Sequence, residues 1–84
     1  MPGRLRLETT ERRAVVVQAA VRIAESEGLA SVTHGNVAGR CVVRTSVPTI
    51  RNYFPHKIDL WRAVLEATTD EDVHMQAATL GVVR

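Results

Sequence analysis

The sequence predicts an all-α fold, and three observations support this. Apolar residues recur every three to four positions along several stretches, which is the period of one face of a helix. Gly28, Pro48 and Pro55 separate these stretches at intervals that suit short helices joined by turns. Hydrophobic residues make up 45% of the 84 residues and aromatic residues only 4%, so the core must be built mainly from Val, Ala, Leu and Ile. A chain of this length forms one compact domain.

The first helix is expected over residues 10–27. Its apolar face consists of Val16, Val17, Ala20, Ile23 and Ala24. The valines at positions 15–17 have β propensity, but the polar residues that follow recur at helical spacing, so we predict a helix rather than a strand. Thr9 or Thr10 is placed to cap its start, and Gly28 supplies the positive-φ residue that commonly ends a helix, with Leu29 closing over the last turn.

A second, short helix is expected to begin at His34. Thr33 is placed to cap it, and Asn36 stands three residues later as a weak version of the capping-box partner. Its apolar face consists of Val37, Ala38 and Cys41. The β-branched and polar residues 42–46 then predict a turn.

A third helix is expected over residues 47–54. Ser46 is a natural cap for it, because Pro48 falls in the first turn, where a missing amide hydrogen costs little. Ile50 and Phe54 lie four residues apart and are expected to face the core. The outward positions are Thr49, Arg51, Asn52 and part of Tyr53.

Two further helices complete the predicted all-α fold. Pro55 ends the third helix, and the fourth carries the apolar stripe Leu60, Trp61, Val64 and Leu65. An acidic, threonine-rich turn follows Ala67. A last, weakly patterned helix is expected to carry Val73, Ala77 and Leu80.

Charge is distributed unevenly along the chain, although the net charge of +2 favours no partner. Residues 28–57 contain no Asp or Glu, and their basic residues are Arg40, Arg44, Arg51 and Lys57. Further basic residues in the first part of the chain are Arg4, Arg6, Arg12 and Arg13. An acid-free segment suits a polyanion, since a carboxylate near a phosphate costs Coulomb energy. On charge alone, a solvated surface with chance clustering explains the pattern equally well.

Two short helices joined by a turn, the second bearing polar and basic side chains, form the arrangement that reads the major groove of DNA. Arg51 and Asn52 are able to make two hydrogen bonds with one base, Arg with guanine and Asn with adenine, so we expect them to contact bases. Hydroxyl groups and Lys57 are expected to hold phosphates. The complete set expected at the DNA interface is Thr33, His34, Arg44, Thr45, Ser46, Val47, Thr49, Arg51, Asn52, Tyr53 and Lys57.

The chain resembles the N-terminal domain of TetR-family transcriptional regulators at three places. These are residues 49–60, TIRNYFPHKIDL, and the pairs Val32-Thr33 and Val37-Ala38. The resemblance covers residues 13–64. It implies a basic arm over residues 1–10 and a three-helix DNA-binding domain with a fourth connecting helix over residues 11–67, in which the helix-turn-helix spans about residues 33–54. Residues 68–84 would then be the truncated start of a C-terminal helical region for dimerisation and ligand binding.

The function implied by this resemblance is that of a cytoplasmic regulator that recognises specific DNA sequences. Such a protein is a repressor that binds a palindromic operator in double-stranded DNA as a homodimer. A small-molecule inducer relieves binding through a C-terminal domain not present in this chain. Two features depart from the family pattern. Between Ala38 and Ser46 the chain is about two residues longer, and Arg44 stands near the position of the usual turn glycine. Arg51 stands where the family often has an aromatic residue.

Other functional classes have less support in the sequence. The main alternative is a small helical protein–protein interaction module that docks a partner helix on the same outward face. We expect no enzyme activity and no cofactor, since no Ser-His-Asp order, glycine-rich phosphate loop or paired-carboxylate pocket is evident. Cys41 and the three histidines lack the paired spacing of a zinc site. No apolar run approaches the roughly 20 residues of a membrane span, and the N-terminus lacks the apolar stretch of a secretion signal.

Overall fold

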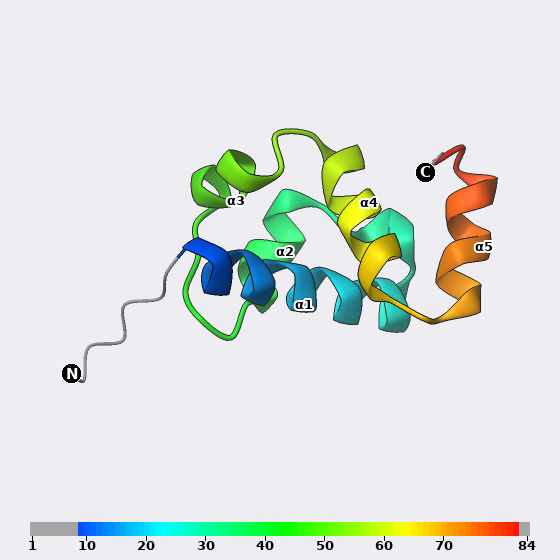
Figure 1. Cartoon of the computed structure of the whole chain (residues 1–84), viewed down its shortest axis with the longest axis horizontal. Helices are drawn as coiled ribbons and strands as arrows, with labels where there is room; N and C mark the ends of the chain where they lie inside the picture. The colour runs from blue at the N-terminus through cyan, green and yellow to red at the C-terminus, as the bar shows by residue number, and fades with distance from the viewer. Residues whose placement is uncertain (1–8, 83–84) are drawn as a thin grey trace.

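The computed structural model describes residues 9–82, and it is all-helical (Figure 1). Its elements are α1 (Thr9–Glu27), the 3-10 helix η1 (Leu29–Ser31), α2 (His34–Arg40), α3 (Val47–Tyr53), α4 (Lys57–Ala67) and α5 (Glu71–Thr79). No strand occurs within residues 9–82, which confirms the predicted fold class. Arg4 and Arg6 of the predicted arm lie outside the described residues. None of the described helices is long and apolar enough to cross a membrane.

α1 is the helix around which the molecule is built. It has 19 residues, which corresponds to about 28 Å, and it contacts α2, α4, α5 and η1. Its buried face consists of Val16, Ala19, Ala20, Ile23 and Ala24, while Val17 is partly buried against the same core. The prediction of a helix rather than a strand at residues 15–17 is confirmed. α1 begins at Thr9, so Thr10 lies inside the helix rather than at its cap.

Gly28 ends α1 with a backbone conformation that suits glycine. Its φ is 100° and its ψ is 153°, a combination that side chains with a Cβ rarely adopt. Its N–H still donates to the carbonyl of Ala24 at 3.0 Å. The positive φ was predicted, but the extended ψ directs the chain into η1 and buries Leu29 completely.

Side-chain caps start α2 and α3 as the sequence predicted. The Oγ1 atom of Thr33 accepts the N–H of Asn36 at 3.1 Å, and the Oγ atom of Ser46 accepts the N–H of Thr49 at 3.3 Å. In a capping box, the side chain of Asn36 would accept the backbone N–H of Thr33. The Asn36 side chain has a different partner. It donates to the carbonyl of Ser31 at 2.7 Å and thereby fastens α2 to η1.

α4 also begins with a bond between its cap and its first turn, because the N–H of His56 donates to Oδ2 of Asp59 at 2.9 Å. The helix buries Leu60, Ala63, Val64 and Leu65. Trp61 of the predicted apolar stripe is partly buried, and its Nε1–H donates to the carbonyl of Val32 at 2.9 Å. This bond ties α4 to the segment just before α2.

The prediction that the last helix carries Leu80 is wrong, since Leu80 follows the end of α5 and 45% of this residue is exposed. α5 carries Val73 and Ala77 as expected and buries both, but it ends at Thr79. Gly81 has a φ of 80°, and the N–H of Val82 donates to the carbonyl of Ala77 at 2.9 Å. This geometry is that of a Schellman motif, in which the residue after the glycine folds back onto the last turn of the helix. Val82 therefore occupies the core in place of Leu80.

Replacement of Phe54 by Ala tests the part of the core that supports α3. Phe54 has an exposed fraction of only 3%. The Arg13 guanidinium lies 4.9 Å from the centroid of its ring. Phe54→Ala should lower the free energy of unfolding by about 3–5 kcal/mol. Urea denaturation followed by circular dichroism measures this loss. Met75→Ala is the matched control, because Met75 is 68% exposed, and it should change stability by less than about 0.5 kcal/mol. Equal effects of the two substitutions would contradict this assignment of the core.

Candidate nucleic-acid interface

α2 and α3 pack against each other and are joined by residues 41–46. This turn is longer than the roughly three- to four-residue turn of a helix-turn-helix, in line with the extra length seen in the sequence. α3 lies at one end of the molecule and α5 at the other (Figure 1). The candidate interface is therefore remote from α5.

The two faces of α3 differ in the way that the sequence predicted. Ile50 is completely buried and Phe54 nearly so, whereas Arg51 and Asn52 are exposed. Tyr53 is half-buried and meets the ring of Phe54 edge-on, with 6.5 Å between the ring centroids. The outward side of α3 thus presents an arginine and an amide above an apolar support.

Four predicted interface residues lie at the starts of α2 and α3. Ser46 is exposed and Thr49 half-buried at the start of α3, where their hydroxyl oxygens are 2.9 Å apart. Val47 is half-buried in the first turn. Thr33 caps α2 and is also half-buried. Capping engages only oxygen lone pairs of Thr33 and Ser46. The bond between the Ser46 and Thr49 hydroxyls uses one of their two hydrogens, so one hydrogen of this pair is left to donate elsewhere.

Two predicted interface residues, His34 and Thr45, are not exposed. His34 is 7% exposed, and its Nε2 lies 2.6 Å from the carbonyl oxygen of Phe54. Thr45 is 6% exposed and donates its hydroxyl hydrogen to the carbonyl of Val43 at 2.9 Å. The burial of His34 depends on its contact with Phe54, twenty positions away in the sequence, so the local sequence pattern did not reveal it. Both side chains serve the internal structure of the helix pair, and we leave them out of the candidate interface.

Basic side chains surround α3. Arg44 is exposed in the turn before α3, and its carbonyl accepts a bond from Nη1 of Arg12 at 3.5 Å. Lys57 is exposed at the start of α4, where its ammonium lies 5.1 Å from the centroid of the Trp61 ring. The Arg12 bond ties the start of α1 to the turn before α3, whereas the contact between Lys57 and Trp61 lies within α4 and positions only the Lys57 side chain.

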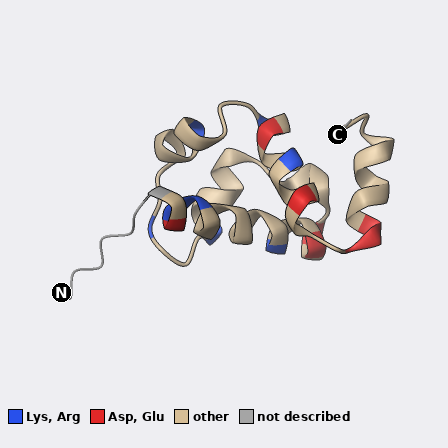
Figure 2. Ribbon diagram, in the orientation of Figure 1, with Lys and Arg blue, Asp and Glu red and all other residues tan. Residues whose placement is uncertain are grey.

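Charge is distributed unevenly along the molecule. Figure 2 shows basic residues at the start of α1, in the turn before α3 and on α3, and acidic residues at the ends of α1 and α4 and the start of α5. Exceptions are Asp59, which lies in the first turn of α4 near Lys57, and Arg22 and Arg62, which lie further along α1 and on α4. Glu11, in the first turn of α1, is an acidic residue at the basic end. Arg40 belongs to the acid-free segment of the sequence, but it forms an ion pair with Glu27, which the sequence analysis did not predict. Its charge is therefore balanced within the protein.

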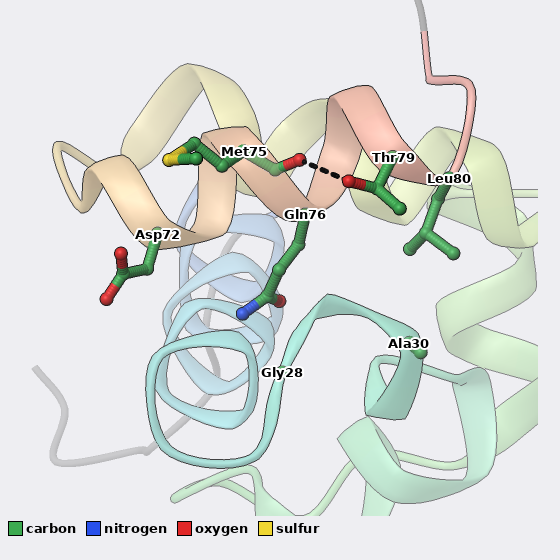
Figure 3. Close-up of a pocket in the computed structure, with 7 residues that line it drawn as sticks. All are labelled: Gly28, Ala30, Asp72, Met75, Gln76, Thr79 and Leu80. Atoms are coloured by element: carbon green, nitrogen blue, oxygen red, sulfur yellow. Dashed lines mark hydrogen bonds between the residues drawn. The ribbon is translucent and has the colours of Figure 1, made fainter.

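A groove that the sequence analysis did not predict lies between α5 and the segment after α1, with a volume of about 570 Å³ (Figure 3). Its lining consists of Gly28, Ala30, Asp72, Met75, Gln76, Thr79 and Leu80. Oε1 of Gln76 accepts the N–H of Leu29 at 2.7 Å and fixes the two walls relative to each other. The lining contains no histidine, cysteine, lysine or arginine. Its polar side chains are Asp72, Gln76 and Thr79.

Metal-binding and thiol chemistry find little support at the described residues. Within residues 9–82, no group of three or more His, Cys, Asp and Glu side chains is arranged to hold a metal ion. Burial raises the pKa of the Cys41 thiol above its ordinary value, although its side-chain hydrogen bond with Thr45 and the charge of Arg22 act in the opposite direction. The protonated thiol is a poor nucleophile and a poor metal ligand.

No family model, curated protein or solved structure matches this chain. The likeness to TetR-family regulators therefore depends on the motif residues of the sequence alone.

The cap of α3 is tested by changing Ser46. Ser46→Ala removes the acceptor for the N–H of Thr49 and should lower the free energy of unfolding by about 1 kcal/mol. Ser46→Asn keeps an oxygen acceptor at this position and should leave stability nearly unchanged. Thermal unfolding of the three chains compares them. If the Ala and Asn variants were equally stable, the Ser46 side chain would have no role as a cap.

Proposed function

We propose that this chain is the DNA-binding part of a transcriptional regulator that recognises specific sequences by placing α3 in the major groove. The observation that carries the proposal is the exposure of Arg51 and Asn52 on α3 while Ile50 and Phe54 are buried behind them. A helix with its side chains is about 10–12 Å across, which matches a major groove about 12 Å wide. Arg51 would read guanine and Asn52 adenine.

We assign the exposed polar and basic residues near α3 to contacts with DNA phosphates. Arg44 is exposed in the turn before the helix and Lys57 is exposed at the start of α4 after it, and the hydroxyls of Ser46 and Thr49 lie at the start of α3. In the proposed complex these groups hold the DNA backbone and set the register of α3, but they carry no base information. Val47, Thr33 and Tyr53 are half-buried beside them and complete the proposed contact surface.

The likeness to TetR-family regulators extends the proposal to a mode of regulation. A homodimer would hold two copies of α3 about 34 Å apart, so that both enter successive major grooves of a palindromic operator. The regulator would act as a repressor, and a small molecule bound by further C-terminal helices would release it from the operator.

The alternative, a protein-interaction module that uses the same face, has less support. A helix that docks into a partner groove presents apolar anchors at helical spacing. Apart from Pro48, the exposed residues of α3 are the polar Arg51 and Asn52. Among the described residues, the large exposed apolar side chains are Val42 in the turn and Met75 and Leu80 on the α5 side.

We expect binding to duplex DNA to weaken steeply as the salt concentration rises, because each phosphate contact releases counterions. Lys57→Ala should weaken binding to all sequences by a similar factor and reduce the slope of log K against log salt by about 1. Lys57→Arg keeps the charge and should retain the slope. Fluorescence anisotropy with labelled duplexes measures both quantities. The absence of duplex binding at low salt would refute the proposed function.

Selection of bound sequences from a random duplex pool separates base readout from phosphate contact. Arg51→Ala should leave the fold intact and relax the preference at one base pair, with a loss of about 1–3 kcal/mol of discrimination. Arg44→Ala should instead lower affinity for every sequence and leave the selected motif unchanged. The reverse outcome would mean that the turn, rather than the outer face of α3, reads the bases.

A further inference from the structure

We propose that His34 is a positioning residue for α3: its buried imidazole fixes the end of α3 against α2 and so sets the direction in which Arg51 and Asn52 point. The inference rests on the proposed function, since it concerns how α3 meets DNA. It also gives a role to a side chain that the sequence placed at the interface and that the structure places inside.

The contact itself is short and directional. Nε2 of His34, the first residue of α2, lies 2.6 Å from the carbonyl oxygen of Phe54, the residue that caps the end of α3. A carbonyl oxygen only accepts hydrogen bonds, so Nε2 carries the hydrogen. The contact is buried, and water does not compete for either partner.

The bond solves a problem that the end of every helix poses. The last carbonyl groups of a helix have no partner within it, and a buried carbonyl left unpaired is costly. Here the donor comes from another helix, twenty positions away in the sequence. Satisfying the carbonyl of Phe54 therefore couples α3 to α2.

Phe54 is held from three sides. Its N–H donates to the carbonyl of Ile50 at 2.8 Å, its ring is buried in the core, and its carbonyl accepts from His34. The donor is anchored as well, because Thr33 caps α2 and the carbonyl of Val32 accepts the indole N–H of Trp61. The bond thus joins two fixed points rather than two mobile ones.

The direction of the exposed side chains depends on this end of the helix. Arg51 and Asn52 lie in the last turn of α3, which has seven residues. Ser46 fixes the first turn, and Phe54 with His34 fixes the last. A base contact tolerates displacements of only about 0.5 Å, whereas contacts with phosphates through long cationic side chains tolerate more. Loss of the His34 bond should therefore reduce specificity before it reduces general affinity.

The test compares His34→Leu, which removes the donor, with His34→Gln, which keeps an N–H donor at a similar distance from the backbone. Affinities for a selected sequence and for an unrelated duplex are measured at one salt concentration, at a temperature where circular dichroism shows both variants folded. His34→Leu should lower the ratio of specific to unspecific affinity about tenfold, the scale of one lost base contact. The unspecific affinity and its salt slope should stay unchanged, and His34→Gln should restore most of the ratio.

Each contrary result has its own meaning. A ratio unchanged in His34→Leu, or lowered equally in the folded His34→Gln, would overturn the inference while leaving the proposed function in place. If the specific and unspecific affinities of the folded His34→Leu chain fell by the same factor, His34 would be merely structural and the inference would fail. A wild-type chain that binds no duplex would overturn both proposals.

A measurement on the unaltered chain does not depend on the folding of a variant. Nitrogen NMR of the His34 ring distinguishes the two neutral tautomers. The hydrogen is expected on Nε2, with a reduced exchange rate of that hydrogen against water. A hydrogen on Nδ1 alone would exclude the bond to Phe54 and refute the inference.

Discussion

The buried face of α1 is the constraint on which the rest of the structure depends. Three of its five fully buried positions are alanines, namely Ala19, Ala20 and Ala24. Small side chains allow neighbouring helices to approach closely, and a larger residue at these positions would push α2, α4 or α5 outward at a cost of about 1–3 kcal/mol. The same helix contributes Arg12 and Arg13 at its start and meets η1 and α5 at its end. It therefore sets the distance between the basic and acidic ends of the molecule.

α3 is held in a different way from the other helices. Its main packing partner is α2, and it buries Ile50 while Phe54 follows at its end. The rest of its placement comes from directional polar contacts at its two ends, at Ser46 and at the carbonyl of Phe54. Such bonds contribute modestly when made but are expensive to leave unmade in a buried place. A short helix held at its ends keeps its whole outer side available for a ligand.

The features that the sequence predicted correctly are local ones. Helical periodicity identified the core face of α1, and the capping preferences of Thr33 and Ser46 identified the starts of α2 and α3, because both signals depend on residues a few positions apart. The burial of His34 and the pairing of Arg40 with Glu27 depend on residues that are distant in the sequence, and no local pattern reveals them. Leu80 was misplaced because helical spacing was continued past Thr79, although Gly81 was a signal that the helix ends there. DNA binding, by contrast, remains a prediction.

The hydrogen bond from the Leu29 amide to Gln76 allows the docking of α5 to be followed by hydrogen exchange. This amide has its acceptor on a side chain of α5, so its hydrogen is protected only while α5 is docked. Amides inside α1 are protected by their own helix whether or not α5 is in place. The deuterium uptake of Leu29, compared with that of the α1 core, would report the free energy of detaching α5 separately from that of global unfolding. Exchange at this one backbone position would thus report the equilibrium between docked and detached α5.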